Sequence, residues 1–351
     1  MEVRRLGRTE LQVGVIGLGT EHFDPSAEER DGILRAAVEA EVNYVVLLYV
    51  ADDYWQAFGP IFRPYRRRFI ATAHWGGDAT MSVDASQQCF DNVLDHLGNG
   101  YAEVAMVTMV DSMEAWTGWG QESVQRLQGY REQGRIGHIG LSGHNETVAL
   151  EVVRSGLIDL LMFPVNLVGH DDERNRAVLR ACAEADVGLV AMKPYHGGTL
   201  LLGTANPPGI SPSQCLAYVL DQEVATTVPG PRTVAEMETT LHYLQATDEE
   251  KDYAAVTGGL HQILAGQCVY CHHCLPCPVD IPVGWVLWQV DYARHGVTED
   301  LKAWYASQPA KASDCVECGD CLDRCPFEVD IMAGLRKAVE IFEAGPALGK
   351  P

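Results

Sequence analysis

Short apolar runs alternate with amphipathic stretches through the first two-thirds of the chain. Eight such runs, rich in β-branched residues, lie at 13–19, 43–48, 68–73, 103–108, 138–143, 158–163, 187–193 and 224–230. Between them apolar residues recur at helical spacing, as in 26–40, 84–98, 122–134 and 172–186. Because helices that alternate with strands return the chain to the same end of a sheet, the pattern predicts an α/β fold with parallel strands.

The number of repeats indicates how the predicted sheet is arranged. Eight successive units of strand and helix are typical of a (β/α)8 TIM barrel. A doubly wound open sheet is the alternative, and in its dinucleotide-binding form it carries a Gly-rich loop after the first strand. The loop here, "GLGTEHF" at 17–23, lacks the third glycine of that fingerprint. We therefore predict a barrel over residues 1–263, with its site at the C-terminal ends of the strands.

Two short runs near the C-terminus contain eight of the eleven cysteines. The run at 315–326 reads C-x2-C-x2-C-x3-C-P, the ligand spacing of one half of a bacterial two-cluster ferredoxin. The run at 268–278 is one residue shorter before its last cysteine. Three thiolates at this spacing can wrap a [4Fe–4S] cluster from one loop, while the fourth must come from elsewhere. We therefore predict a ferredoxin-like domain with two [4Fe–4S] clusters over residues 264–351.

The comparison with two-cluster ferredoxins also assigns each cysteine to one of the two clusters. In two-cluster ferredoxins the last cysteine of each run serves the other cluster. The expected ligands are Cys268, Cys271, Cys274 and Cys325 for one cluster, and Cys315, Cys318, Cys321 and Cys277 for the second. The alternative is a pair of zinc sites with four cysteines each, although zinc knuckles generally use two separated C-x2-C pairs. Since eight ligands fill two clusters, the clusters are expected to carry electrons rather than bind substrate.

The formal net charge of −22 limits the partners of the protein. A surface this acidic repels nucleic-acid phosphates and anionic lipids, so we expect neither nucleic acid nor a membrane as a partner. The sequence has no apolar stretch long enough to span a bilayer, and its first residues lack the apolar core of a signal peptide. We therefore expect a cytoplasmic protein, where clustered cysteines are metal ligands more often than disulfides.

Several segments resemble the aldo-keto reductase superfamily. They are "RRLGRTELQVGVIGLGT", "GRIGHIGLSGHN", "DLLMFPVNLV", "VGLVAMKPYHGG" and "VATTVPGPRTVAEMETTL". Together with the cysteine runs, they look most like a bacterial branch of that superfamily with an appended ferredoxin-like domain. The resemblance implies a barrel and carbonyl reduction by NADPH, with a catalytic tetrad of Asp, Tyr, Lys and His.

The chain departs from the family pattern at all four tetrad positions. The residues found there are Val46, Ala51, Ala73 and Thr108, in place of Asp, Tyr, Lys and His. A small shift of the alignment would supply Tyr49 or Tyr54, or His74, but neither the Asp nor the Lys. A proton donor whose pKa is tuned by a lysine and a carboxylate needs both partners. We therefore do not expect NADPH-dependent carbonyl reduction at a rate typical of the family.

The positions that hold the nicotinamide nucleotide in the family are also altered. Met162 stands where the family has Gln, and Glu236 stands near the expected adenosine phosphate. A carboxylate repels a 2′-phosphate rather than binding it. Arg232 is the remaining candidate for cofactor binding, and the sequence predicts that NAD(P)H binding is weakened.

Lys193, His74 and His144 are the candidate catalytic residues. They end or follow the seventh, third and fifth predicted strands, whose C-terminal ends meet at the mouth of a barrel. A cationic lysine beside imidazoles suits an anionic or carbonyl-bearing ligand, and imidazole can transfer protons near neutral pH.

These features favour an iron–sulfur oxidoreductase in which two [4Fe–4S] clusters pass electrons to or from the barrel mouth. One alternative is a non-catalytic electron-transfer or scaffold subunit of a larger redox complex. Another is an NAD(P)H-dependent aldo-keto reductase with displaced catalytic residues. The expected partners are a redox protein, such as a ferredoxin, a flavoprotein or a complex subunit, and a small-molecule substrate.

Overall fold

The computed structural model describes residues 1–48, 50–76, 81–170, 172–201, 210–293 and 296–343. The chain divides into two compact units, and the boundary along the sequence lies between Ala254 and Ala255. This is earlier than the boundary expected after residue 263. The difference arises because almost all of helix α11 (Ala254–Ile263) belongs to the second unit.

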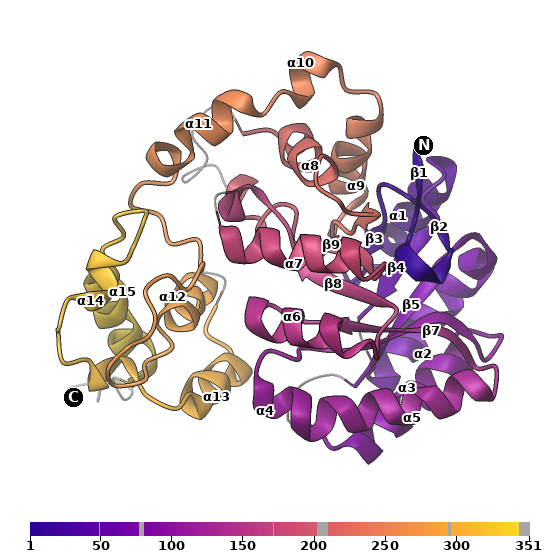
Figure 1. The fold of residues 1–351 in the computed structure, drawn as a ribbon, viewed down its shortest axis with the longest axis horizontal. Helices are drawn as coiled ribbons and strands as arrows, with labels where there is room; N and C mark the ends of the chain where they lie inside the picture. The colour runs from indigo at the N-terminus through magenta and orange to yellow at the C-terminus, as the bar shows by residue number, and fades with distance from the viewer. Residues whose placement is uncertain (49, 77–80, 171, 202–209, 294–295, 344–351) are drawn as a thin grey trace, which may run out of the picture. The chain divides into compact units, whose positions relative to one another are not determined.

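Eight parallel strands of the first unit form a single sheet in chain order, as predicted (Figure 1). They are β3 (Leu18–Gly19), β4 (Tyr44–Leu47), β5 (Ile70–Trp75), β6 (Ala102–Val107), β7 (Ile136–Ser142), β8 (Leu160–Pro164), β9 (Gly188–Met192) and β10 (Thr226–Thr227). Ile16 and Thr227 form a parallel bridge between the two ends of the sheet. Backbone N–H groups of Gly17 and Gly19 donate to the carbonyl oxygens of Thr227 and Pro229 at 2.7 and 2.8 Å. The sheet is therefore closed, and the barrel is confirmed over the open sheet.

The run predicted as one strand at 13–19 is divided in two by the fold. Its first part lies in β2 (Gln12–Gly14), which pairs antiparallel with β1 (Val3–Arg5). Only Leu18 and Gly19 enter the barrel sheet as β3. Leu6 and Val13 are fully buried in the same apolar cluster as barrel residues, so this hairpin closes the N-terminal end of the barrel. The sequence pattern could not show the division, because both parts are apolar.

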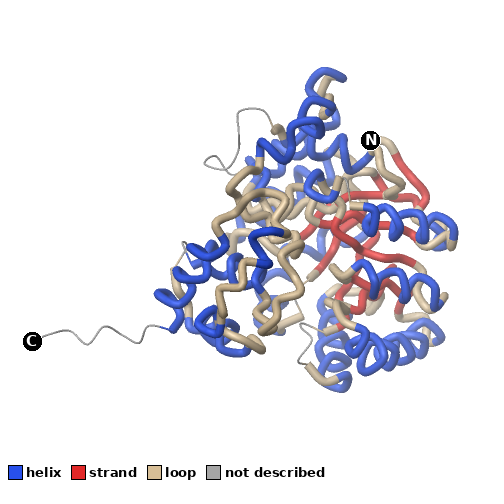
Figure 2. Tube along the Cα trace, turned by 60° about the vertical axis from the view of Figure 1, so that its left-hand side comes forward, coloured by secondary structure: helices blue, strands red, loops and turns tan. Residues whose placement is uncertain are grey.

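Helices surround the strands of the first unit (Figure 2). They are α1 (Ala27–Glu39), α2 (Asp52–Phe62), α3 (Val83–His96), α4 (Met113–Ala115), α5 (Gln121–Glu132), α6 (Glu146–Ser155), α7 (Glu173–Glu184), α8 (Pro212–Leu220), α9 (Val234–Leu241) and α10 (Asp248–Lys251). Side chains cap several N-termini; Ser26 and Ser82, for example, accept from backbone N–H groups of α1 and α3. Among the described residues, no helix is both long and apolar enough to cross a membrane.

The second unit repeats one motif, a cysteine loop followed by a helix. Its helices include α11, almost all of which lies in this unit, and α12 (Val283–Tyr292), α13 (Glu299–Ser307), α14 (Asp320–Asp323) and α15 (Ile331–Ala338). Both loops have positive φ at matching places, namely Tyr270 and His272 in the first and Glu317 and Gly319 in the second.

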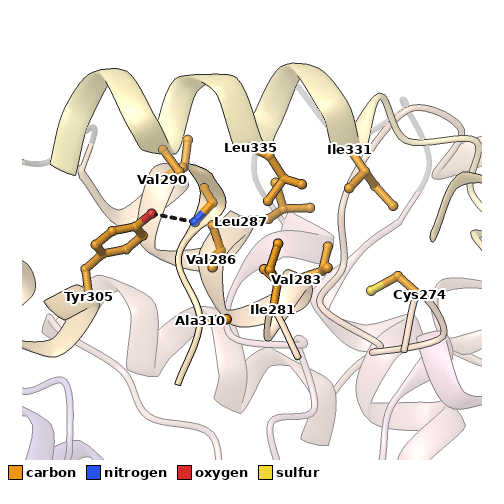
Figure 3. Packing of buried hydrophobic residues seen from close by; sticks show 12 residues of the cluster. Cys274, Ile281, Val283, Val286, Leu287, Val290, Tyr305, Ala310, Ile331 and Leu335 are labelled. Carbon is orange, nitrogen blue, oxygen red and sulfur yellow. Dashed lines mark hydrogen bonds between the residues drawn. The ribbon is translucent and has the colours of Figure 1, made fainter. Parts of the chain in front are cut away.

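Apolar side chains of α12 and α15 form the core of the second unit. Val286, Leu287 and Val290 of α12 belong to one buried cluster with Ile331 and Leu335 of α15 (Figure 3). This packing joins the two halves of the repeat, because each half contributes one helix to the same core.

Candidate active site and cysteine loops

Strand register decides which side chains of β5 face the interior of the barrel. Val46 pairs with Thr72, and His74 pairs with Met106. Paired residues on neighbouring strands point to the same face, and residues two apart on one strand do so as well. Because Val46 and Met106 belong to the interior apolar cluster, His74 faces the interior with them. Ala73, the residue at the family's Lys position, faces the opposite side.

His74 is buried and contacts Thr108, the residue that stands at the family's His position. Its Nδ1 lies 2.7 Å from Thr108 Oγ1, and the residue is only 1% exposed. Burial lowers the pKa of His74 to about 3, so its imidazole is neutral at physiological pH. Its Nε2 has no hydrogen-bond partner among the described residues.

Asp111 and His144 form a hydrogen-bonded pair on the loops that follow β6 and β7. His144 Nδ1 lies 3.1 Å from Asp111 Oδ2, and the His144 backbone N–H donates to Asp111 Oδ1 at 2.5 Å. Burial alone would raise the pKa of Asp111. The bonds from His144 and the charge of Lys193 outweigh that effect and lower the pKa. Asp111 therefore remains a carboxylate that orients the imidazole.

Lys193 follows β9 directly and has a φ of 56°. Asn166 Nδ2 donates to its backbone carbonyl at 3.1 Å. The Lys193 side chain reaches solvent, yet surrounding protein desolvates it enough to lower the pKa of its ammonium. The nearby carboxylates of Asp111 and Glu21 act in the opposite direction and favour the charged form. Lys193 thus belongs to the same electrostatic group as Asp111 and His144.

The structure brings two of the three predicted catalytic residues into one group. His144 and Lys193 are linked through Asp111, which the sequence analysis did not select. In the sequence, Asp111 is marked as a candidate only by its position just beyond the fourth predicted strand. No hydrogen bond or ion pair among the described residues joins His74 to Lys193 or to His144. A carboxylate behind an imidazole, with a cation nearby, is suited to proton transfer and to stabilising negative charge on oxygen.

Of the two tyrosines considered as replacements, Tyr54 lies among the described residues. Tyr54 lies on α2, where its ring packs 5.3 Å from that of Phe58. Tyr49 lies outside the described residues.

Carboxylates occupy the N-terminus of α9, where the family resemblance places the adenosine phosphate. The backbone N–H of Arg232 donates to Glu236 Oε2 at 2.6 Å, and that of Val234 donates to Glu29 Oε2 at 2.7 Å. Free N–H groups at a helix N-terminus would favour a phosphate, but here two carboxylates already accept from them. The exposed Arg232 is the cation at this place. A 2′-phosphate at this place would face two carboxylates of like charge.

Two hollows in the second unit are lined by the predicted cluster ligands. One is lined by Cys277, Cys315, Cys318 and Cys321, together with Cys274. The other is lined by Cys268, Cys271, Cys274 and Cys325. Disulfide bonds join none of these cysteines. Within the described ranges, no three His, Cys, Asp or Glu side chains are grouped closely enough to hold a single metal ion.

Burial strongly raises the pKa of two of the thiols around these hollows. Burial raises the pKa of Cys268 to about 12, and burial with the neighbouring Cys271 raises that of Cys274 to about 11. The backbone N–H of Glu317 donates to Cys315 Sγ at 3.4 Å. Thiols with such raised pKa values stay protonated near neutral pH, and a bound metal cation would favour their thiolate form.

Comparison with known proteins places the barrel unit in a family. A search of curated proteins found no match. The holo form of aldo-keto reductase AKR11C1 from Bacillus halodurans is similar with a TM-score of 0.60 at 18% identity, covering 73% of this chain and 96% of that chain. PA4992 from Pseudomonas aeruginosa, assigned as an aldo-keto reductase, has a TM-score of 0.55 at 22% identity, covering 69% and 96%. At these identities the likeness shows the fold alone. Residues 10–211, more than half of the chain, match the Aldo/keto reductase family, and the chain therefore belongs to that family.

Proposed function

We propose that this protein is a carbonyl-reducing oxidoreductase of the aldo-keto reductase family in which displaced residues replace the usual tetrad. The hydrogen-bonded pair of Asp111 and His144, with Lys193 in the same electrostatic group, carries this proposal. The family match supports it better than a barrel that acts only as a scaffold, or one that receives electrons only through iron–sulfur clusters.

In this proposal His144 is the proton donor. Its Nδ1 faces Asp111, which leaves Nε2 as the nitrogen available to a substrate. As hydride arrives at the carbonyl carbon, imidazolium Nε2–H gives its proton to the carbonyl oxygen, and an alcohol forms. Asp111 stabilises the imidazolium before transfer, and the Lys193 ammonium stabilises negative charge that develops on the oxygen. In this family a reduced nicotinamide nucleotide supplies the hydride.

The carboxylates at α9 favour NADH over NADPH as that nucleotide. Glu29 and Glu236 would face the 2′-phosphate of NADPH with like charge. NADH has a 2′-hydroxyl instead, which a carboxylate can accept from. We therefore propose that a nucleotide bound here lacks the 2′-phosphate.

A screen of simple aldehydes with both nucleotides tests the reductase proposal. We expect turnover with NADH and a much lower kcat/KM with NADPH. The double variant Glu29→Gln/Glu236→Gln should raise kcat/KM for NADPH about 10-fold, because removing two like charges is worth on the order of 1 kcal/mol or more. Glu28→Gln, an exposed neighbour of Glu29, is the matched control and should leave the preference unchanged. A wild-type preference for NADPH would contradict the nucleotide assignment, and absence of turnover with either would contradict the proposed function.

We further propose that the second unit is a ferredoxin-like domain that binds two [4Fe–4S] clusters. The sequence predicted two ligand quartets, and each quartet lines one of the two hollows. Matching positive-φ positions in the two loops support a common way of wrapping a ligand. Bound clusters would supply one-electron transfer chemistry, with a redox protein as the partner.

Iron and sulfide analysis of anaerobically purified protein tests the cluster proposal. We expect about eight iron and eight sulfide ions per chain, because each cluster contains four of each. Reduction with dithionite should produce EPR signals of [4Fe–4S]⁺. Stoichiometric zinc without sulfide would show that the cysteines form zinc sites instead.

A further inference from the structure

Arg30 is a buried cation near the N-terminal end of α1. The residue is only 8% exposed. Its Nε donates to the carbonyl oxygen of Asp24, at 3.0 Å, in the loop that joins β3 to α1. The guanidinium group lies over two rings of α2, 5.2 Å from the centre of Tyr54 and 5.9 Å from that of Phe58. Arg30 therefore places a positive charge between α1 and α2.

The carboxylates closest to Arg30 in the sequence are bonded to other groups. Asp24 and Glu29 accept from backbone N–H groups at 2.8 and 2.7 Å, and Asp31 accepts from the Tyr65 hydroxyl at 2.8 Å. Within the described part of the chain, no carboxylate forms an ion pair with Arg30. An arginine cannot relieve burial by losing its proton, as a lysine can. Because a buried charge without a counter-charge is costly, the guanidinium is suited to a bound anion.

The two terminal nitrogens of Arg30 are available as hydrogen-bond donors. Neither Nη1 nor Nη2 donates to an acceptor among the described residues, and neither atom is sealed from solvent. Each nitrogen carries two hydrogens, and one N–H of each lies parallel to the other in the planar group. This fork matches two oxygen atoms of a single carboxylate or phosphate group.

We propose that Arg30 is the centre of an oxyanion-binding site between α1 and α2, which binds a carboxylate or phosphate group through Nη1 and Nη2. Since little of Arg30 is exposed, the site accepts a small anion or the anionic end of a larger molecule. Glu28 and Glu29 in the first turn of α1 oppose any anion, which favours one that also accepts two hydrogen bonds over chloride. The proposal does not depend on the reductase function.

NMR of the full-length protein labelled with ¹⁵N-arginine tests the fork directly. A signal that disappears in Arg30→Lys assigns the guanidinium group. We expect separate Nη–H signals of Arg30 to appear on titration with sodium phosphate or sodium acetate, because a bidentate anion slows rotation about the Cζ–Nη bonds. Sodium chloride at the same ionic strength should not produce them. Signals that stay averaged with both oxyanions would overturn the proposal.

Thermal unfolding of matched variants tests the same site. At tenfold its dissociation constant, the bound oxyanion should raise the Tm of the wild type by about 3–5 °C relative to chloride. Arg30→Met should lose this rise. Arg35→Met should keep it, because Arg35 is an exposed residue of the same helix, 3.9 Å from Asp31. An equal rise in Arg30→Met and the wild type would show that the oxyanions act elsewhere and would refute the site.

The choice of probe distinguishes the sources of the oxyanion. A rise with acetate alone assigns a carboxylate, and a rise with phosphate alone assigns a phosphate. If NADH also separates the Arg30 signals and inorganic phosphate competes with it, the oxyanion belongs to the nucleotide. If NADH leaves those signals unchanged while phosphate or acetate separates them, the site serves a different ligand. None of these measurements needs turnover, so a failure of carbonyl reduction would refute the proposed function without affecting this test.

Discussion

Replacing Cys277 by alanine should remove the cluster that we propose for Cys315, Cys318 and Cys321, although Cys277 belongs to the other cysteine run. The reason is its place in the second unit, where Cys277 lines the same hollow as those three residues. A [4Fe–4S] cluster that loses one of four thiolates is expected to be labile. Iron content should fall from about eight to about four per chain, with loss of one of two EPR signals.

Cys325→Ala provides the mirror experiment, since Cys325 lines the hollow of Cys268, Cys271 and Cys274. The two variants should lose different clusters, so their remaining EPR spectra should differ. Cys89→Ala, a change on α3 of the barrel unit, is the control and should keep both clusters. If Cys277→Ala instead damages the cluster of its own run, the exchange of fourth ligands between the loops is wrong.

Removal of the proton donor should lower the rate of carbonyl reduction by a factor of about 10²–10⁴, the usual contribution of general acid catalysis. This is the expected result for His144→Gln, measured as kcat with saturating NADH and an aldehyde that the wild type reduces. Asp111→Asn should lower kcat as well, because the imidazolium loses the negative charge that stabilises it.

A hydrogen-bonded histidine and carboxylate on the surface serve as the control for these variants. His242 Nε2 lies 3.1 Å from Glu250 Oε1, and both side chains are about half exposed. His242→Gln should therefore leave kcat unchanged. Circular dichroism of each variant shows whether the barrel is intact. A folded His144→Gln protein with wild-type kcat would exclude His144 as the acid.

The barrel could be predicted because the apolar patterns of its strands and helices are set by residues close together in the chain. Each strand is a short apolar run, and helices such as α1, α3, α5 and α7 repeat apolar residues at helical spacing. The exception at 13–19 has a physical explanation. Val13 pairs with Arg4 in the hairpin, and no local pattern distinguishes an apolar hairpin residue from an apolar barrel residue.

The site was less predictable because it depends on contacts between distant loops. Sequence reasoning selected Lys193 and His144 from their places after strands, but not Asp111, which joins them. It placed Glu236 near the expected phosphate but missed Glu29, which is far away in sequence. The Glu29 carboxylate accepts a hydrogen bond from the backbone N–H of Val234 at the same helix end.

The sequence by itself determined the order of strands and helices and the two cysteine runs, because periodicity and ligand spacing are set by residues close together in the chain. The tertiary structure decided that His74 rather than Ala73 faces the barrel interior. Cys277 and Cys325, which the ferredoxin spacing assigned to the opposite run, each line a hollow with that run. Neighbouring residues of a strand point to opposite faces, so a shift of one position exchanges inside for outside. Only the hydrogen-bonded register between strands fixes that position, and only packing of α12 against α15 brings the two cysteine loops together.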